Sequence, residues 1–279
     1  MSIDHLINAE ELVEKAGRVR RTILSLVHRT KGPHIGSAFS CVELLVSLYS
    51  RFLHVSPENP FDPQRDRFIF SKGHASPALY AVLHECGFVS DEDLKGFAVN
   101  NGCFEQHPNM NIEKGIEVST GSLGHGLSIG AGMALAAKRD RKRNRVCVLV
   151  SDGELNEGSI WEAVLFSAHH KLDNLLLVVD YNKMQALGFT RDTLDLDPLK
   201  AKFEAFGWAC ADADGHRFSS LIGVLEEVPF QEDKPSVIIA HTIKGKGVSF
   251  MENNLYWHYG CPNDEEYALA LAELSHDIT

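Results

Sequence analysis

The segment VCVLVSDGELNEG, residues 146–158, sets the expectation for the fold of this chain. An unbroken apolar run precedes Ser151 and Asp152, and such a run is typical of a strand that is buried on both faces of a parallel sheet. Apolar side chains at helical spacing follow at Trp161, Leu165 and Ala168. The segment therefore predicts a strand, then a loop that carries a carboxylate, then a helix.

Similar apolar runs recur along the chain, at residues 67–70, 175–179, 208–213 and 237–240. Apolar residues at helical spacing over 6–30 and 42–53, on either side of a glycine-rich break at 32–37, predict two amphipathic helices that cover a sheet. No repeat or low-complexity tract divides the sequence. We therefore expect an α/β fold with a parallel central sheet and helices on both faces. It would form a single domain over residues 1–279, with a short acidic helical tail at about 262–279.

Composition narrows the possible functions. The chain has 279 residues, is 44% hydrophobic and carries a formal net charge of −11, which disfavours nucleic acid or an anionic membrane as a partner. The first residues do not resemble a signal peptide, and no apolar run reaches membrane-spanning length, so a cytoplasmic location is expected. The six cysteines include no CxxC pair, which favours reduced thiols over a zinc site or a disulfide framework.

Two predicted strands end in oxygen-bearing side chains. Asp152 follows the first run, and Asn182 follows the run at 175–179, thirty positions later. Parallel strands end at the same edge of a sheet, so these side chains should converge there. A carboxylate, an amide oxygen, a backbone carbonyl and diphosphate oxygens together suit Mg²⁺ or Ca²⁺, and a diphosphate would dock against the amides at the start of the following helix. An Asp-Gly pair alone indicates only a turn, but the second loop favours a metal and diphosphate site.

This Asp-Gly and Asn arrangement resembles the thiamine-diphosphate signature, and its surroundings resemble the transketolase family. The likeness runs nearly from end to end and rests on stretches at 31–36 (KGPHIG), 71–76 (SKGHAS), 119–126 (STGSLGHG), 240–247 (AHTIKGKG) and 257–258 (WH). It identifies the chain as the diphosphate-binding half of a split transketolase, with the thiamine-diphosphate-binding fold.

The resemblance implies a role for particular residues. It assigns the metal to Asp152, Asn182 and the main-chain carbonyl of Met184. It assigns thiamine diphosphate to a set of loop residues that comprises His74, Gly121, Leu123, Gly153, Glu154, Asn182 and His258. Catalytic roles fall to His34, His74 and His258, as hydrogen-bond donors and proton shuttles, and to Glu157. With Glu162, Glu157 would lie at a subunit interface where acidic side chains link paired active sites.

The implied reaction is the transfer of a two-carbon ketol unit from a ketose, as a sugar phosphate or modified sugar, to an aldose acceptor. In this cofactor class a glutamate from a pyrimidine-binding domain activates the aminopyrimidine, and the sequence leaves no room for that domain. We therefore expect activity only with a partner, a C-terminal transketolase subunit, in an α2β2 assembly. A component of another thiamine-diphosphate enzyme, such as a 2-oxoacid dehydrogenase or a deoxyxylulose-phosphate-synthase relative, is the alternative, and residues 71–74 argue against the latter. A non-catalytic paralogue is a third possibility, against which intact Asp152 and Asn182 argue.

Some positions depart from the family pattern. Asn101 or Gly102 falls where single-chain transketolases place a substrate-binding histidine, His125 replaces a common glutamine, and Tyr259 stands where glycine is typical of split relatives. These changes leave open a standard pentose phosphate or a branched, sulfonated or otherwise modified ketose. The pattern also leaves His107 either lining the cleft or capping a turn, and the basic run at 138–145 is expected to be a solvated face.

Overall fold

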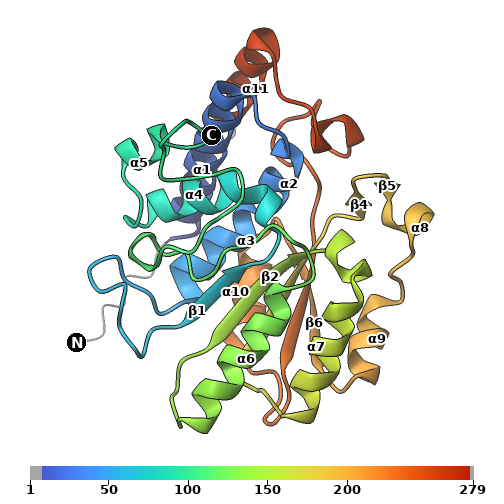
Figure 1. The fold of residues 1–279 in the computed structure, drawn as a ribbon. Helices are drawn as coiled ribbons and strands as arrows, with labels where there is room; N and C mark the ends of the chain where they lie inside the picture. Colours follow the sequence, from blue (N-terminus) through green and yellow to red (C-terminus); the bar gives the residue numbers. More distant parts are fainter. Residues whose placement is uncertain (1–7, 277–279) are drawn as a thin grey trace.

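The computed structural model describes residues 8–276, which surround a five-stranded parallel sheet (Figure 1). In sheet order the strands are β1 (Arg67–Phe70), β2 (Val146–Ser151), β3 (Leu175–Tyr181), β7 (Ser236–His241) and β6 (Ala209–Asp214). All neighbouring strands run parallel, and the register places Ser151 beside Asp180. The predicted parallel α/β fold is therefore confirmed, with each strand within two residues of its expected bounds.

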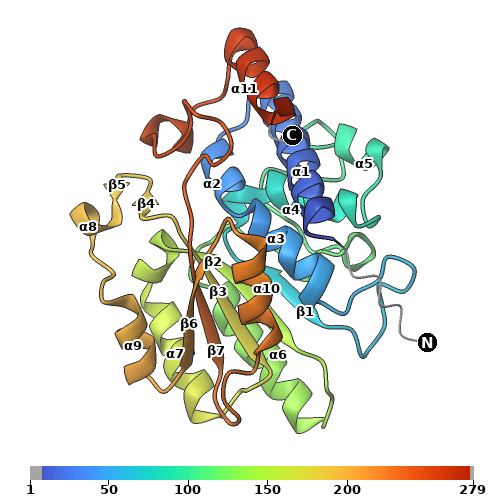
Figure 2. The same cartoon turned by 180° about the vertical axis from the view of Figure 1, so that it is seen from behind.

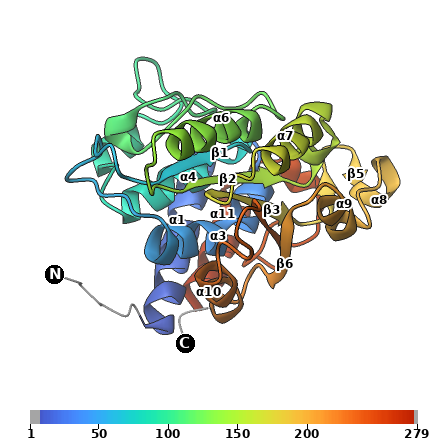
Figure 3. The ribbon, with the colours of Figure 1, turned by 90° about the horizontal axis from the view of Figure 1, so that it is seen from below.

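Helices cover both faces of the sheet (Figures 2 and 3). One face carries α2 (Ile35–Ser40), α3 (Val42–Ser47), α4 (Ser76–Glu85) and α10 (Phe218–Glu226), and α1 (Ala9–Thr30) packs on α3 and α4. The other face carries α6 (Gly126–Arg139), α7 (Gly158–His169) and α9 (Leu199–Ala205). Alternate residues of one strand enter opposite cores, since Cys147 and Leu149 lie in the first and Val146 and Val148 in the second. This alternation explains why the strand is apolar throughout.

The remaining elements are short, apart from one helix near the C-terminus. They are the π-helix η1 (Leu48–Phe52), the 3-10 helices η2 (Gly73–Ala75), η3 (Ile112–Lys114), η4 (Gly153–Asn156) and η5 (Leu255–His258), the helices α5 (Asp91–Lys95) and α8 (Thr190–Thr193), and the hairpin of β4 (Met184–Gln185) with β5 (Gly188–Phe189). The helix α11 (Asp264–His276) lies beside α1 (Figure 2) and buries Ala270 and Leu274.

Two details of the predicted fold are wrong. The break expected at 32–37 already contains the start of α2, and every residue of α2 and α3 is buried, so this region is not the amphipathic cover expected over 42–53. Its helices lie between the sheet and α1, which leaves them no solvent face. The run at 208–213 is not buried on both faces either, because β6 is the edge strand and Asp212 and Asp214 are exposed.

None of the helices within residues 8–276 is long and apolar enough to cross a membrane. The six cysteines are all free thiols in this structure.

Candidate active site

A pocket of about 260 Å³ lies where the loops that follow β2, β3 and β7 meet the segments before α2 and around η2 and η5. Most of the residues singled out from the sequence line it: His34, His74, Gly121, Leu123, Asp152, Gly153, Asn182, Met184 and His258. The structure therefore brings together residues that are separated by more than 220 positions of the sequence, at the edge of the sheet where they were expected.

Asp152 and Asn182 form the oxygen-rich wall of this pocket. Asp152 is 1% exposed, and its carboxylate accepts hydrogen bonds from Gly153 N at 2.7 Å and Lys183 N at 2.5 Å. The Asn182 Oδ1 atom accepts from Met184 N at 3.1 Å. Burial and the nearby charge of Asp180 raise the pKa of Asp152 to about 7. A buried carboxylate with a raised pKa is stabilised by a cation, so these residues fit a hard divalent metal.

The protein supplies too few ligands to hold such a metal alone. Within residues 8–276, no three His, Cys, Asp or Glu side chains gather into a metal site. One carboxylate, one amide oxygen and the carbonyl of Met184 leave several positions of a six-coordinate ion open. A diphosphate beside the Gly153 amide can fill them, which fits a site that binds metal and diphosphate together.

A buried charge network lies behind this wall and was not predicted. The Lys72 ammonium pairs with the Asp180 carboxylate and also donates to Ser37 O at 2.9 Å. Asp180 accepts further bonds from Ser40, at 2.6 Å, and from Thr242. Burial opposes its ionisation, but Lys72 and these hydrogen bonds outweigh burial and lower the pKa of Asp180. The network fixes the ends of β3 and β7 below the pocket.

Lys244 is a second buried cation and lines the pocket itself. Its Nζ atom lies 2.8 Å from His258 Nδ1 and 3.5 Å from Met184 O. Burial lowers the pKa of Lys244 to about 8. Lys244 lies in one of the stretches that resemble the family, but no role was predicted for it; a lysine between a strand end and two glycines was the available signal.

Three histidines form a cluster at the other side of the pocket. The ring centroids of His34 and His74, and of His34 and His258, are both 5.2 Å apart. Burial and nearby cationic groups lower the pKa of His34 to about 4 and of His258 to about 3, and the pKa of His74 falls well below its ordinary value. All three imidazoles are therefore neutral at pH 7, which allows each to donate through one nitrogen and accept through the other.

Glycines allow the backbone of the loop at 119–126 to pack closely against other residues of the pocket. Gly121 has φ +140°, and a Cβ there would lie 2.6 Å from the ring of His107. His107 lines the pocket, which settles its two alternatives in favour of the cleft. Glu154, by contrast, is fully buried and accepts bonds from Ser71 Oγ and, at 2.8 Å, from Gly124 N. It supports the loop from behind, and its side chain is not among those that line the pocket.

Several other predicted residues lie away from the pocket. Glu157 and Glu162 are exposed on the surface of this chain. Asn101 and His125 are also exposed and do not line the pocket. These two departures from the family pattern therefore do not alter the part of the pocket that this chain forms. Tyr259, the third departure, does line the pocket. Its ring lies 4.6 Å from that of His258 and 5.7 Å from that of His34, and the residue is 65% exposed at the pocket mouth.

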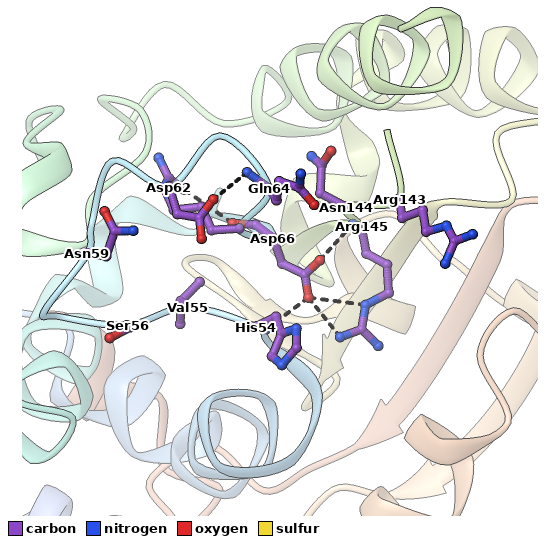
Figure 4. A pocket seen from close by; sticks show the side chains of 11 residues that line it. His54, Val55, Ser56, Asn59, Asp62, Gln64, Asp66, Arg143, Asn144 and Arg145 are labelled. Carbon is purple, nitrogen blue, oxygen red and sulfur yellow. Dashed lines mark hydrogen bonds and ion pairs between the residues drawn. The ribbon is translucent and has the colours of Figure 1, made fainter. Parts of the chain in front are cut away.

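A larger hollow of about 540 Å³ lies at the opposite edge of the sheet, before β1 and β2 (Figure 4). Its buried carboxylate is used by the fold itself, since Asp66 accepts bonds from Arg145 N, Nε and Nη2 at 2.7–3.1 Å and from His54 N at 2.9 Å. The basic run at 138–145 is mostly exposed, as expected, but Arg145 is an exception because of this pairing. None of the sequence stretches that resemble the family lines this hollow, so the pocket that holds Asp152 remains the candidate site.

The fold and the pocket define an α/β protein whose pocket, at the carboxyl edge of a parallel sheet, fits a diphosphate and a divalent metal. The family described as "Transketolase, thiamine diphosphate binding domain" matches residues 12–277. The chain belongs to this family.

Named relatives agree. An apulose-4-phosphate transketolase subunit of Phocaeicola vulgatus is 39% identical over 272 residues, which are 98% of this chain and 96% of the relative. The 6-deoxy-6-sulfo-D-fructose transketolase subunit of a Clostridium species is 39% identical over 264 residues, 95% of this chain and 96% of the relative. The solved transketolase of Leishmania mexicana superposes with a TM-score of 0.88 at 25% identity, over 96% of this chain but only 42% of that one.

Proposed function

We propose that this chain is the diphosphate-binding subunit of a thiamine-diphosphate-dependent transketolase, which transfers a two-carbon ketol unit from a ketose to an aldose. The observation that carries the proposal is the convergence of Asp152, Asn182 and Met184 with three neutral histidines in one pocket. The names of the full-length relatives, which are transketolase subunits, support it.

Each wall of the pocket suits one part of the cofactor. Asp152, Asn182 and the Met184 carbonyl hold Mg²⁺ or Ca²⁺, and the Gly153 amide, His74 and His258 contact the diphosphate. Gly121 and Leu123 lie against the aminopyrimidine, where the absence of a side chain at Gly121 permits close approach.

When bound, thiamine diphosphate supplies a nucleophilic carbon and an electron sink for cleavage of the carbon–carbon bond. The chain itself supplies position and proton transfer. Being neutral, His34 can accept a proton from a substrate hydroxyl through one ring nitrogen while donating through the other, and His258 serves as a hydrogen-bond donor. The Lys244 ammonium at 2.8 Å from His258 Nδ1 fixes that nitrogen as the acceptor and leaves Nε2–H free to donate.

A partner subunit completes the site. Among the described residues that line the pocket, Asp152 is the one carboxylate, and it lies at the metal end. We therefore assign the activating glutamate to a C-terminal transketolase subunit that carries the pyrimidine-binding domain. Large apolar side chains exposed beside the mouth, Leu187 at 80% and Tyr259 at 65%, are suited to burial by such a partner. Residues 1–279 act as one domain in an α2β2 assembly, with Glu157 and Glu162 at its interface.

The donor is a modified ketose, branched or sulfonated. Relatives of near-equal length are named for apulose 4-phosphate and for 6-deoxy-6-sulfo-D-fructose. Tyr259 narrows the mouth directly beside His34 and His258, where a substrate would enter.

The test is ketol transfer by the chain purified together with its partner, measured with a panel of ketoses and aldose acceptors. Activity should require both thiamine diphosphate and a divalent cation, and chelation should abolish it. Decarboxylation of 2-oxoacids without ketol transfer would instead favour the 2-oxoacid dehydrogenase alternative.

A further inference from the structure

The backbone on both sides of Lys244 is held by side chains from distant parts of the chain. Ile243 N donates to His216 Nε2 at 2.8 Å, and Lys246 O accepts from Arg20 Nε at 2.9 Å. His216 lies in the loop between β6 and α10, and Arg20 lies in α1. Two side chains therefore hydrogen-bond to the backbone on either side of Lys244, at Ile243 and at Lys246.

Glu43 joins these two side chains. Its carboxylate lies 2.6 Å and 2.8 Å from the two terminal nitrogens of Arg20, and it accepts from His216 Nδ1 at 2.9 Å. The three side chains are only 8–13% exposed. Burial raises the pKa of Glu43, but Arg20 and the hydrogen bonds from His216 and Arg20 outweigh burial and lower it to about 2. Glu43 is thus ionised and holds the proton of His216 on Nδ1, which leaves Nε2 free to accept from Ile243.

The backbone of the segment 243–247 also has little conformational freedom of its own. Gly245 has φ +82° and donates its N–H to Gly36 O at 2.9 Å, and a Cβ at Gly245 would lie 2.2 Å from Met251 O. Gly247 packs against the stem of Arg20, where a Cβ would lie 2.9 Å from Cδ. Lys244 is a long side chain, so its ammonium reaches one position reproducibly only if this backbone is fixed.

We propose that Arg20, Glu43 and His216 act as positioning residues that set Lys244 and, through Lys244, the His258 imidazole in the cofactor pocket. The proposal rests on the function proposed above for that pocket. None of the three lines the pocket, so their effect on cofactor binding passes through the segment 243–246.

Two substitutions at position 216 separate this role from a purely structural one. The amide of Gln reaches about as far as Nε2 of histidine and can accept from Ile243 N, whereas the amide of Asn reaches only as far as Nδ1 and can donate to Glu43. His216→Gln therefore keeps the bond to the Lys244 segment and loses the bond to Glu43, while His216→Asn does the reverse. Arg20→Lys is a second, independent variant, since it keeps a cation beside Glu43 and loses the Nε donor to Lys246 O.

A matched control is the ion pair between Arg65 and Glu117, which is similarly shielded, with side chains 12% and 11% exposed, and lies outside the pocket lining. Glu117→Gln should lower the melting temperature of the cofactor-free protein without changing cofactor affinity.

The experiment is titration of thiamine diphosphate into the wild-type and variant complexes with the partner subunit, at saturating Mg²⁺, together with melting temperatures without cofactor. We expect His216→Asn and Arg20→Lys to raise the dissociation constant roughly tenfold or more, the size seen when groups that orient a ligand-contacting residue are removed. His216→Gln should stay within about threefold of wild type, a change below 1 kcal/mol. Unchanged affinity in His216→Asn and Arg20→Lys, or weaker binding by His216→Gln than by His216→Asn, would overturn the proposal. A wild-type complex that binds no thiamine diphosphate would instead overturn the proposed function.

Discussion

Replacing Asp152 with Asn should stabilise the cofactor-free protein at high pH while it removes metal-dependent cofactor binding. The folded-state pKa of Asp152, about 7, lies above the ordinary value of 3.8. A raised carboxyl pKa means that the folded state favours the neutral form, so the stability that this group contributes is present below pH 3.8 and is lost as the pH rises through 7. At 1.36 kcal/mol per pKa unit, the ionised carboxylate costs the cofactor-free fold at most about 4 kcal/mol above pH 7.

Asparagine at position 152 does not recover the whole cost of the ionised carboxylate. Both carboxylate oxygens accept backbone N–H bonds, from Gly153 and Lys183, so the amide NH2 of Asn would face one of those donors. Such a mismatch costs about 1–3 kcal/mol. A net gain of about 2 kcal/mol remains at pH 8, which corresponds to a rise of about 5 °C in melting temperature for a domain of this size. At pH 5 Asp152 is neutral in the folded state but ionised in the unfolded chain, so about 1.6 kcal/mol of the cost remains in wild type. This roughly offsets the mismatch, and the variant should melt close to wild type at pH 5.

The affinity of Asp152→Asn for the cofactor should fall, although the stability of the cofactor-free protein at high pH rises. Removing one charged partner from a buried ion pair costs about 3–5 kcal/mol, so the dissociation constant of thiamine diphosphate with Mg²⁺ should rise at least about a hundredfold. Thermal melts at pH 5 and 8 and calorimetry on the complex with its partner measure the two effects, with the exposed Asp192→Asn as the control. Equal cofactor affinity in Asp152→Asn and wild type would refute the metal assignment, and an equal shift in melting temperature at both pH values would refute the reasoning on charge.

Other substitutions test separate parts of the pocket. Gly121→Ala should lower cofactor affinity, because the positive φ of Gly121 and the 2.6 Å approach to His107 leave no room for a Cβ. Gly132→Ala in α6, where a Cβ would meet nothing within 4 Å, should leave the affinity unchanged. Equal affinities of the two variants in calorimetry would show that the loop at Gly121 is not closely packed. Lys72→Met should cost about 3–5 kcal/mol of unfolding free energy, because it leaves Asp180 buried without its cation, and a denaturation midpoint equal to wild type would contradict this. Tyr259→Gly should widen the mouth and improve kcat/KM for xylulose 5-phosphate relative to modified ketoses; an unchanged ranking of donors would show that Tyr259 does not set specificity.

The sequence allows the sheet and the oxygen-rich wall of the pocket to be predicted, because both depend on local signals. A buried parallel strand is a continuous apolar run, and the residue that ends it lies at a known edge of the sheet, so Asp152 and Asn182 could be placed together. The burial of α2 and α3 could not be predicted, because their helical spacing is the same whether solvent or another helix covers the second face. The exposure of β6 depends on strand order, which no local pattern of the run at 208–213 encodes.

The supporting side chains escaped prediction for a different reason. Lys72 pairs with Asp180 across 108 positions of sequence, and Arg20 pairs with Glu43 across 23 positions and donates to the Lys246 carbonyl across 226. Each of these residues looks like an ordinary surface charge until the fold buries it, and only then must it find a partner of opposite charge. Glu154 shows the converse, since the family resemblance assigned it a cofactor contact, but its carboxylate points inward to the Gly124 amide.

The most direct measurement is ketol transfer by the purified chain, by the purified partner and by their mixture, with the mass of each determined in solution. We expect no transfer from either protein on its own and full activity from an α2β2 mixture. The reason is that, in the proposed function, Asp152 is the one carboxylate among the described residues that line the pocket and it serves the metal, so a partner must supply the carboxylate that activates the aminopyrimidine. Full activity from the 279-residue chain without its partner would contradict this expectation and would require an activating carboxylate within this sequence.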